Sequence, residues 1–372
     1  MKLYMKEKLQ KTDKKVWIMG GLFLVLIIII IFGGAYLYNK FFYKRSYEEV
    51  ETIMLEASKN YLSKNPEKFP QNINDSISIS ASSLVNAGEM KTIENYLKKE
   101  DNSCSGEVKV TNINNDYRYA VFLECGDQKQ TVKFTDYINN NVQIVNSGNG
   151  LYNLNNELVY RGDNVDNYIT FSGKKYRIVK IVGEHTVIIY TEKTENEIWD
   201  DRYNIEQDES SGINDYSVSR IREYLDDLYQ GTTLIAEEDK LLVAAHDIGI
   251  GRRNTKDTDK TGYLENSVTL NNQYIGLLQM NDYLNASLDV NCTTSISPSC
   301  ANYNYLSKYK YNWWTMTASN ANSYRVFRIG GSSEAITASA NSSGSVRAVL
   351  YLTKDAIYVS GDGTEENPYI VK

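Results

Sequence analysis

The longest uninterrupted apolar stretch of the chain lies near its start, at residues 16–38. It contains no charged residue, and isoleucine fills every position from 27 to 31. A helix of this length covers roughly 34 Å, enough to cross a hydrocarbon core of about 30 Å. Because no comparable stretch follows, the pattern predicts a single transmembrane helix at 16–38. A secretory signal peptide is the alternative, but its apolar core is shorter, about 7 to 15 residues.

A second helix is predicted soon after this stretch. Ser46 and Glu49 have the spacing of a capping box, which satisfies free amide groups at a helix start. Apolar side chains then recur at three- and four-residue steps until Asn65 and Pro66 end the helix. They are Val50, Ile53, Met54, Ala57 and Tyr61. The helix is either a stalk that binds a partner or one layer of a small domain, and the chain that follows favours the domain.

Alternating apolar positions predict a three-stranded antiparallel meander after this helix. Val108 and Val110 mark its first strand, residues 119–123 its second and residues 132–134 its third. Residues 39–135 therefore form a small α+β domain. The segment 136–155, which is rich in Asn and Gly, is interpreted as a linker.

About 220 residues follow this linker, enough for one sizeable core. Within the domain 156–372, the pattern predicts a hairpin at 169–182, a strand at 187–190 and a helix at 215–229. The run 241–245 fits a buried strand or a helix equally well. The predicted fold class is α+β.

The charge distribution predicts how the chain is oriented in a membrane. Residues 1–15 contain six lysines, whereas the other flank contains Lys40, Lys44 and Arg45. Positive residues favour the cytoplasmic side, so we expect a cytoplasmic tail at 1–15 and the remaining bulk outside the plasma membrane. Residues 46–372 carry a net charge of −14, since the first 45 residues contribute +7 to a total of −7. This negative net charge of residues 46–372 argues against nucleic-acid binding.

The four cysteines all lie beyond the predicted span and form two close pairs. They are Cys104 with Cys125, and Cys292 with Cys300. Even, close pairing in an external segment predicts two disulfide bonds. A zinc site would require closer cysteine spacing and histidine partners, and the sequence has only His185 and His246. We therefore expect no metal site and no cofactor. The run 249–253, Gly-Ile-Gly-Arg-Arg, lacks phosphate-loop spacing and is a weak indication of an anion site.

The order of a lysine-flanked span, a helix and a small antiparallel sheet resembles the pilin-like proteins of Gram-positive cell surfaces. This resemblance covers residues 16–135 and implies a membrane-proximal domain. The cleavage motif of true prepilins is missing, which puts polymerisation into a pilus in doubt.

A second resemblance rests on motifs near the end of the chain. Trp313 and Trp314 begin one predicted strand, residues 324–331 form a hairpin with a glycine turn, and Arg347 lies in a Val-Arg-Ala-Val strand. This combination is similar to the C-type-lectin-like domains of bacterial surface proteins. Over residues 157–372 it implies helices that flank an irregular antiparallel sheet, with long loops that present a ligand surface.

Candidate ligand-binding residues follow from this second resemblance. Adjacent strand residues face opposite sides, so we expect one of Trp313 and Trp314 in the core and the other exposed to stack on a ligand. Arg347 is interpreted as a structural bridge to a carboxylate. The remaining candidates lie in the polar stretch between the predicted strands: Asn320, Asn322, Tyr324 and Arg325.

The leading hypothesis is a membrane-anchored, adhesin-like protein of a Gram-positive cell that binds a glycan or a surface protein. A structural wall or pilus-associated component without ligand binding is the first alternative, and an extracellular enzyme is the second. A related branch of the lectin-like fold, the sulfatase-modifying oxidases, depends on reactive cysteines, whereas Cys292 and Cys300 suit a structural clip. Since no catalytic constellation is evident either, we expect no enzyme.

Overall fold

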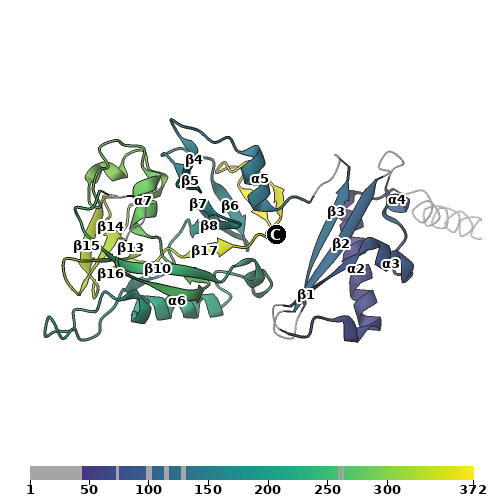
Figure 1. Cartoon of the computed structure of the whole chain (residues 1–372), viewed down its shortest axis with the longest axis horizontal. Helices are drawn as coiled ribbons and strands as arrows, with labels where there is room; N and C mark the ends of the chain where they lie inside the picture. Colours follow the sequence, from purple (N-terminus) through teal and green to yellow (C-terminus); the bar gives the residue numbers. More distant parts are fainter. Residues whose placement is uncertain are drawn as a thin grey trace, which may run out of the picture. The chain divides into compact units, whose positions relative to one another are not determined.

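The computed structural model describes residues 44–72, 75–97, 103–112, 117–126, 131–258, 260 and 264–372 (Figure 1). The predicted cytoplasmic tail at 1–15 and transmembrane helix at 16–38 lie outside these residues. Within the part described, no helix is long and apolar enough to cross a membrane. The chain divides after residue 130 into two compact units, each of which is considered by itself.

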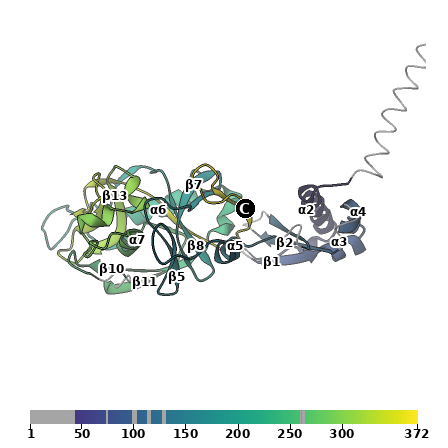
Figure 2. The ribbon, with the colours of Figure 1, turned by 90° about the horizontal axis from the view of Figure 1, so that it is seen from above.

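The smaller unit packs helix α2 (Tyr47–Lys64) on one face of a three-stranded antiparallel sheet (Figure 2). The predicted capping box is confirmed: Ser46 Oγ accepts a hydrogen bond from the Glu49 amide, and the Glu49 carboxylate accepts one from the Ser46 amide. The helix buries Val50, Met54 and Leu62 against the sheet side of the unit. Three short helices complete this unit: η1 (Pro66–Lys68), α3 (Ala81–Asn86) and α4 (Ile93–Tyr96).

The strand order of the smaller unit differs from the predicted meander. Strand β2 (Cys104–Asn112) pairs with β3 (Tyr117–Cys125) as expected, but the third strand is β1 (Ser76–Ser80) rather than residues 132–134. In β1 two isoleucines alternate with serines, a period of two that suits a strand on the surface of a sheet. The predicted disulfide between Cys104 and Cys125 is present and joins directly opposed positions of β2 and β3.

The larger unit begins at residue 131, inside the range expected for the small domain, and it includes the segment 136–155, which was expected to be a linker. Helix α5 (Phe134–Asn141) buries Phe134 and Ile138, which are four residues apart and therefore share one face. The ring of Tyr137 stacks on that of Tyr358, with centroids 3.6 Å apart. The many asparagines of this segment are exposed to solvent. They dominate its composition, so the two apolar residues that pack into the core are not apparent from the sequence.

The larger unit is built on two sheets with few helices (Figure 1), which confirms a mixed α+β class. One sheet has the order β12-β17-β8-β7-β6-β19-β18, and the hairpin of β4 and β5 joins it at β7. Its strands are β4 (Gly150–Leu154), β5 (Glu157–Arg161), β6 (Tyr168–Phe171), β7 (Lys174–Val182), β8 (His185–Tyr190), β12 (Ile275–Gly276), β17 (Val349–Leu352), β18 (Tyr358–Ser360) and β19 (Tyr369–Val371). The predicted hairpin at 169–182 is β6 and β7.

The second sheet has the order β11-β10-β13-β14-β15, with β16 attached to β13 and β9 attached to β16. Its strands are β9 (Asn196–Ile198), β10 (His246–Arg253), β11 (Glu265–Gln273), β13 (Trp313–Ser319), β14 (Arg325–Ile329), β15 (Ala335–Ser339) and β16 (Ser343–Ser345). Most pairings are antiparallel, but β10 and β16 run parallel to β13, and β19 runs parallel to β6.

The helices of the larger unit are short. Besides α5, those among the described residues are η2 (Tyr216–Val218), α6 (Arg220–Gln230), η3 (Glu237–Leu242), α7 (Met280–Ala286), η4 (Pro298–Ala301) and η5 (Tyr305–Lys308). The helix predicted at 215–229 is thus split, because Ser219 ends η2 and its hydroxyl caps α6. The ambiguous run 241–245 ends a 3-10 helix and continues as extended chain that bridges to β17.

Both tryptophans of β13 are fully buried, so the expectation that one of them faces solvent is wrong. Trp314 Nε1 donates to the carbonyl oxygen of Glu197 at 2.9 Å. The backbone at Gly344 packs so closely on this ring that an added Cβ would lie 2.7 Å from Nε1. On the other face, the Trp313 ring packs edge-on against Tyr283 at a centroid distance of 6.1 Å. The two tryptophan side chains therefore do point to opposite faces of the sheet, as predicted. Both are buried because β13 is an inner strand whose two faces are covered.

Candidate functional site

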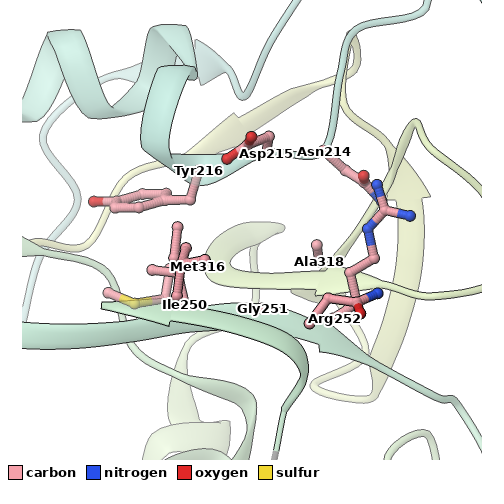
Figure 3. A pocket seen from close by; sticks show the side chains of 10 residues that line it. Asn214, Asp215, Tyr216, Ile250, Gly251, Arg252, Met316 and Ala318 are labelled. Carbon is pink, nitrogen blue, oxygen red and sulfur yellow. The ribbon is translucent and has the colours of Figure 1, made fainter. Parts of the chain in front are cut away.

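An open pocket of about 320 Å³ lies on the larger unit, between residues 214–216 and strands β10, β11 and β13 (Figure 3). Its floor is apolar and is formed by Ile250 of β10 with Met316 and Ala318 of β13. These strands are parallel neighbours, with Arg252 opposite Ala318. The sheet therefore brings side chains more than sixty residues apart in sequence to one concave surface.

Asn214 forms one wall of the pocket and is held by three backbone hydrogen bonds. Its Nδ2 donates to the carbonyl oxygens of Ser319, Asn322 and Arg325, at 2.9, 2.8 and 2.8 Å. Only 2% of the residue is exposed, yet its Oδ1 has no hydrogen-bond partner among the described residues. A buried acceptor without a partner costs free energy, which the three hydrogen bonds of the same amide group offset in part.

The second polar group of the pocket is the guanidinium of Arg252, which lies opposite the apolar floor. Figure 3 shows its side chain rising from β10 toward Asn214. Within the described chain, Arg252 makes neither a side-chain hydrogen bond nor an ion pair. The carboxylate of Asp215, on the rim, is already engaged, since its Oδ1 accepts hydrogen bonds from the amide and hydroxyl of Ser217. The guanidinium of Arg252 therefore has no ion-pair partner among the described residues.

Tyr216 closes the pocket beside Met316, and its hydroxyl group has no partner in the described structure. Burial raises the pKa of this hydroxyl, so it stays protonated at neutral pH. The pocket thus combines a free cation and an unpartnered amide oxygen with an apolar floor, which is the composition of a small-ligand site.

Of the four polar candidates predicted from the sequence, Asn320, Asn322 and Tyr324 lie in the loop between β13 and β14, and Arg325 begins β14; none of them lines the pocket. Asn320 Nδ2 donates to the Glu265 carboxylate at 2.9 Å, and Asn322 Oδ1 accepts from the Arg325 amide. The Arg325 guanidinium donates to the carbonyl oxygen of Thr337 and lies 5.9 Å from the Tyr324 ring centroid. These side chains chiefly stabilise the conformation of the loop, while its backbone carbonyl groups accept the hydrogen bonds from Asn214.

Sequence reasoning missed Asn214, Asp215, Tyr216 and Met316 as pocket residues. Arg252 belongs to the run 249–253, whose glycines and arginines gave a weak indication of an anion site. In the structure Gly251 lines the pocket, and a Cβ there would lie 2.8 Å from the Glu265 carbonyl oxygen. The glycine is needed for the close approach of β11, not for a phosphate loop.

Three loops meet next to this pocket and form what we call the three-loop surface: residues 200–213, 319–324 and 339–343. Asn204 joins the first two, because its Nδ2 donates to the carbonyl oxygen of Gly212 and to Ser323 Oγ. Asn341 joins the third, since its Nδ2 donates to the Ser210 carbonyl oxygen at 3.0 Å. At the tip of the first loop, Ile205 is 87% exposed. Loops fixed to one another in this way on a rigid scaffold commonly carry binding residues.

The two histidines of the chain meet away from the pocket. Their ring centroids are 6.1 Å apart, and the His246 ring stacks on Tyr351 at 3.9 Å. Burial and the neighbouring His185 lower the pKa of His246 below its ordinary value of 6.5, with Lys180 adding to this effect and Asp247 opposing it. Across the described residues, no group of three or more His, Cys, Asp or Glu side chains could hold a metal ion.

The lowered pKa of His246 predicts a pH dependence of stability. The folded state disfavours the protonated ring, so its contribution is complete above pH 6.5 and decreases as the pH falls below that value. We expect His246→Phe, which keeps a ring against Tyr351, to flatten the stability profile between pH 7 and 5. Urea unfolding at several pH values checks this. Identical slopes for the two proteins over that range would contradict it.

Comparisons with known proteins assign no role to the pocket or to the three-loop surface. Comparisons of this chain with protein-family models, with curated proteins and with solved structures gave no match.

Proposed function

We propose that this chain is a membrane-anchored extracellular binding protein whose larger unit recognises a glycan or a surface protein. The observation that supports this most directly is the guanidinium of Arg252, which has no ion-pair partner among the described residues and lies in an open pocket, opposite an apolar floor. The adjoining three-loop surface adds contact area, with Ile205 at its exposed tip. Binding by the pocket and the loops together is the function that these features favour.

The chemistry of the pocket narrows the ligand group that we propose. A guanidinium without a partner binds a carboxylate, phosphate or sulfate by charge-assisted hydrogen bonds. The floor of Ile250 and Met316 suits an apolar face of the same ligand. An acidic sugar residue or an acidic protein side chain next to such a face meets both requirements.

The extracellular placement is supported by the two cysteine pairs. Both are joined as disulfides, Cys104 with Cys125 and Cys292 with Cys300. Disulfides persist mainly in oxidising surroundings such as the cell exterior. In the proposed arrangement residues 16–38 anchor the chain, and both units lie outside the membrane. Protease treatment of intact cells tests this, because it should remove both units while residues 1–15 remain protected.

The binding proposal makes a direct prediction for Arg252→Met. With a glycan and surface-protein array probed by the full-length protein in detergent, we expect at least one anionic ligand, and at least a 30-fold loss of affinity in this variant. Removing a hydrogen-bonded charge from a binding site costs about 2 to 5 kcal/mol, which corresponds to such a loss.

Lys354→Met is the matched control, because it also removes one positive charge, at an exposed ion pair with Glu184. Its affinity should equal that of the wild type. If the array yields no ligand, a structural surface component becomes the better account. If a ligand is found but Arg252→Met binds it equally well, the site lies elsewhere, for example on the three-loop surface.

A further inference from the structure

Three arginines are buried in the larger unit, and two of them, Arg177 and Arg347, form no ion pair with any described residue. Arg177 of β7 and Arg347, just before β17, are both fully buried. Arg177 donates from Nε to the side-chain oxygen of Asn167 and from Nη2 to the carbonyl oxygen of Val165. Arg347 donates from Nε to the carbonyl oxygen of Tyr190 at 3.1 Å. All three acceptors are neutral, so the interpretation of Arg347 as a bridge to a carboxylate is wrong.

The same region leaves several buried donors without an acceptor. Among the described residues, no partner is found for Arg177 Nη1, for Nη1 and Nη2 of Arg347, or for the indole N–H of Trp313. The buried hydroxyl of Tyr311 also lacks one. A guanidinium keeps its proton in proteins, so these are two permanent positive charges away from water. Burying such a charge unpaired costs several kcal/mol.

Aromatic rings surround both guanidinium groups and compensate part of this cost. Arg177 lies 3.7 Å from the ring centroid of Tyr168 and 4.8 Å from that of Tyr305. Arg347 lies 3.6 Å from the centroid of Tyr309 and 5.0 Å from that of Trp313. Cation–π contacts use the flat face of a guanidinium and leave the N–H groups in its plane unsatisfied. Those N–H groups are the donors that lack a partner.

Acidic side chains near this cluster are engaged elsewhere. Asp282 pairs with Lys180 at 3.1 Å, and Glu192 accepts a hydrogen bond from the Tyr190 hydroxyl. Neither forms an ion pair with Arg177 or Arg347. The unpartnered N–H groups of the two arginines therefore find no acceptor within the described chain.

We infer that Arg177 and Arg347 form an internal anion site that takes a small inorganic anion, such as chloride, when the unit folds. Such an ion accepts hydrogen bonds from several N–H donors at once and neutralises the charge that cation–π contacts leave. Complete burial of both side chains excludes a large ligand. This site is separate from the pocket at Arg252, whose lining includes neither arginine.

Thermal unfolding of the full-length protein in sodium chloride and in sodium gluconate, at equal ionic strength, tests this inference. Only chloride is small enough for the site, so we expect the Tm to rise with chloride concentration, by roughly 5 °C at a hundred times Kd. Arg347→Met should abolish this chloride dependence. In gluconate it should be at least as stable as the wild type, because it removes an unpaired buried charge.

Arg325→Met is the matched control, since its guanidinium is partly exposed and bonds the Thr337 carbonyl oxygen. It should keep the full chloride dependence. Soaking bromide into crystals of the wild-type protein gives a second readout. It requires no variant and so does not depend on whether a variant folds. An anomalous peak within hydrogen-bond distance of both arginines is the expected result. Equal Tm values of the wild type in the two salts, or no such peak, would overturn the inference.

Discussion

Replacing Trp314 with alanine is expected to lower the free energy of unfolding of the larger unit by about 3 to 5 kcal/mol. The ring is fully buried and donates a hydrogen bond to the Glu197 carbonyl oxygen. The Gly344 backbone lies directly on it, and the Arg328 guanidinium lies 5.5 Å from its centroid. The rigid contacts at Gly344 cannot collapse into the space that alanine would leave, so a cavity persists. Urea denaturation followed by near-UV circular dichroism measures the loss.

Trp314→Phe is the control for this prediction. It keeps an aromatic ring in the site and loses mainly the hydrogen bond, so the cost should be clearly smaller than for alanine. A surface residue that stacks on a ligand would cost less than about 0.5 kcal/mol when replaced. A loss below 1 kcal/mol for Trp314→Ala would therefore contradict the burial described above.

Removing the Cys104–Cys125 disulfide is expected to destabilise the smaller unit by about 3 kcal/mol. The bond closes a segment with a sequence separation of 21 and joins opposed residues of β2 and β3. A unit of this size has a small hydrophobic core and therefore a low total free energy of unfolding. The disulfide contributes a large fraction of that free energy. Hydrogen exchange of the β2 and β3 amides in the double variant Cys104→Ala, Cys125→Ala measures the change.

The double variant Cys292→Ala, Cys300→Ala is the matched control. It removes a disulfide from the other unit, so protection of β2 and β3 should stay as in the wild type. Unchanged protection of these strands after loss of Cys104 and Cys125 would show that the bond contributes little to the unit.

The elements that sequence predicts well here are those whose signals are local. The helix that starts at Ser46 has its cap and its apolar face within eighteen residues, and the hairpin of β6 and β7 has its turn at Ser172 and Gly173. The tryptophan pair shows where local reasoning stops. Alternation assigns the two rings to opposite faces, but only the position of β13 inside the sheet reveals that both faces are covered.

The candidate site depends still more on contacts between distant segments. No local pattern marks Asn214, because its role is set by three carbonyl groups more than a hundred residues away. Arg252 could be noticed but not interpreted, since its surroundings come from a parallel strand pairing with β13. Arg347 is a similar case. That it bonds a backbone carbonyl group and no carboxylate can be recognised only from the three-dimensional arrangement of its neighbours.

The way the larger unit closes would have a mechanical consequence if residues 16–38 anchor the chain as proposed. The segment that enters the unit is fastened to the segment that ends it: the Phe134 amide donates to the Ala356 carbonyl oxygen, and the Tyr358 amide to that of Val132. A force applied at residue 131 would therefore act first on the last strands, through these two hydrogen bonds. It would reach the inner strands only after the two bonds had broken. A short truncation at the C-terminus would lower the force at which the unit begins to unravel.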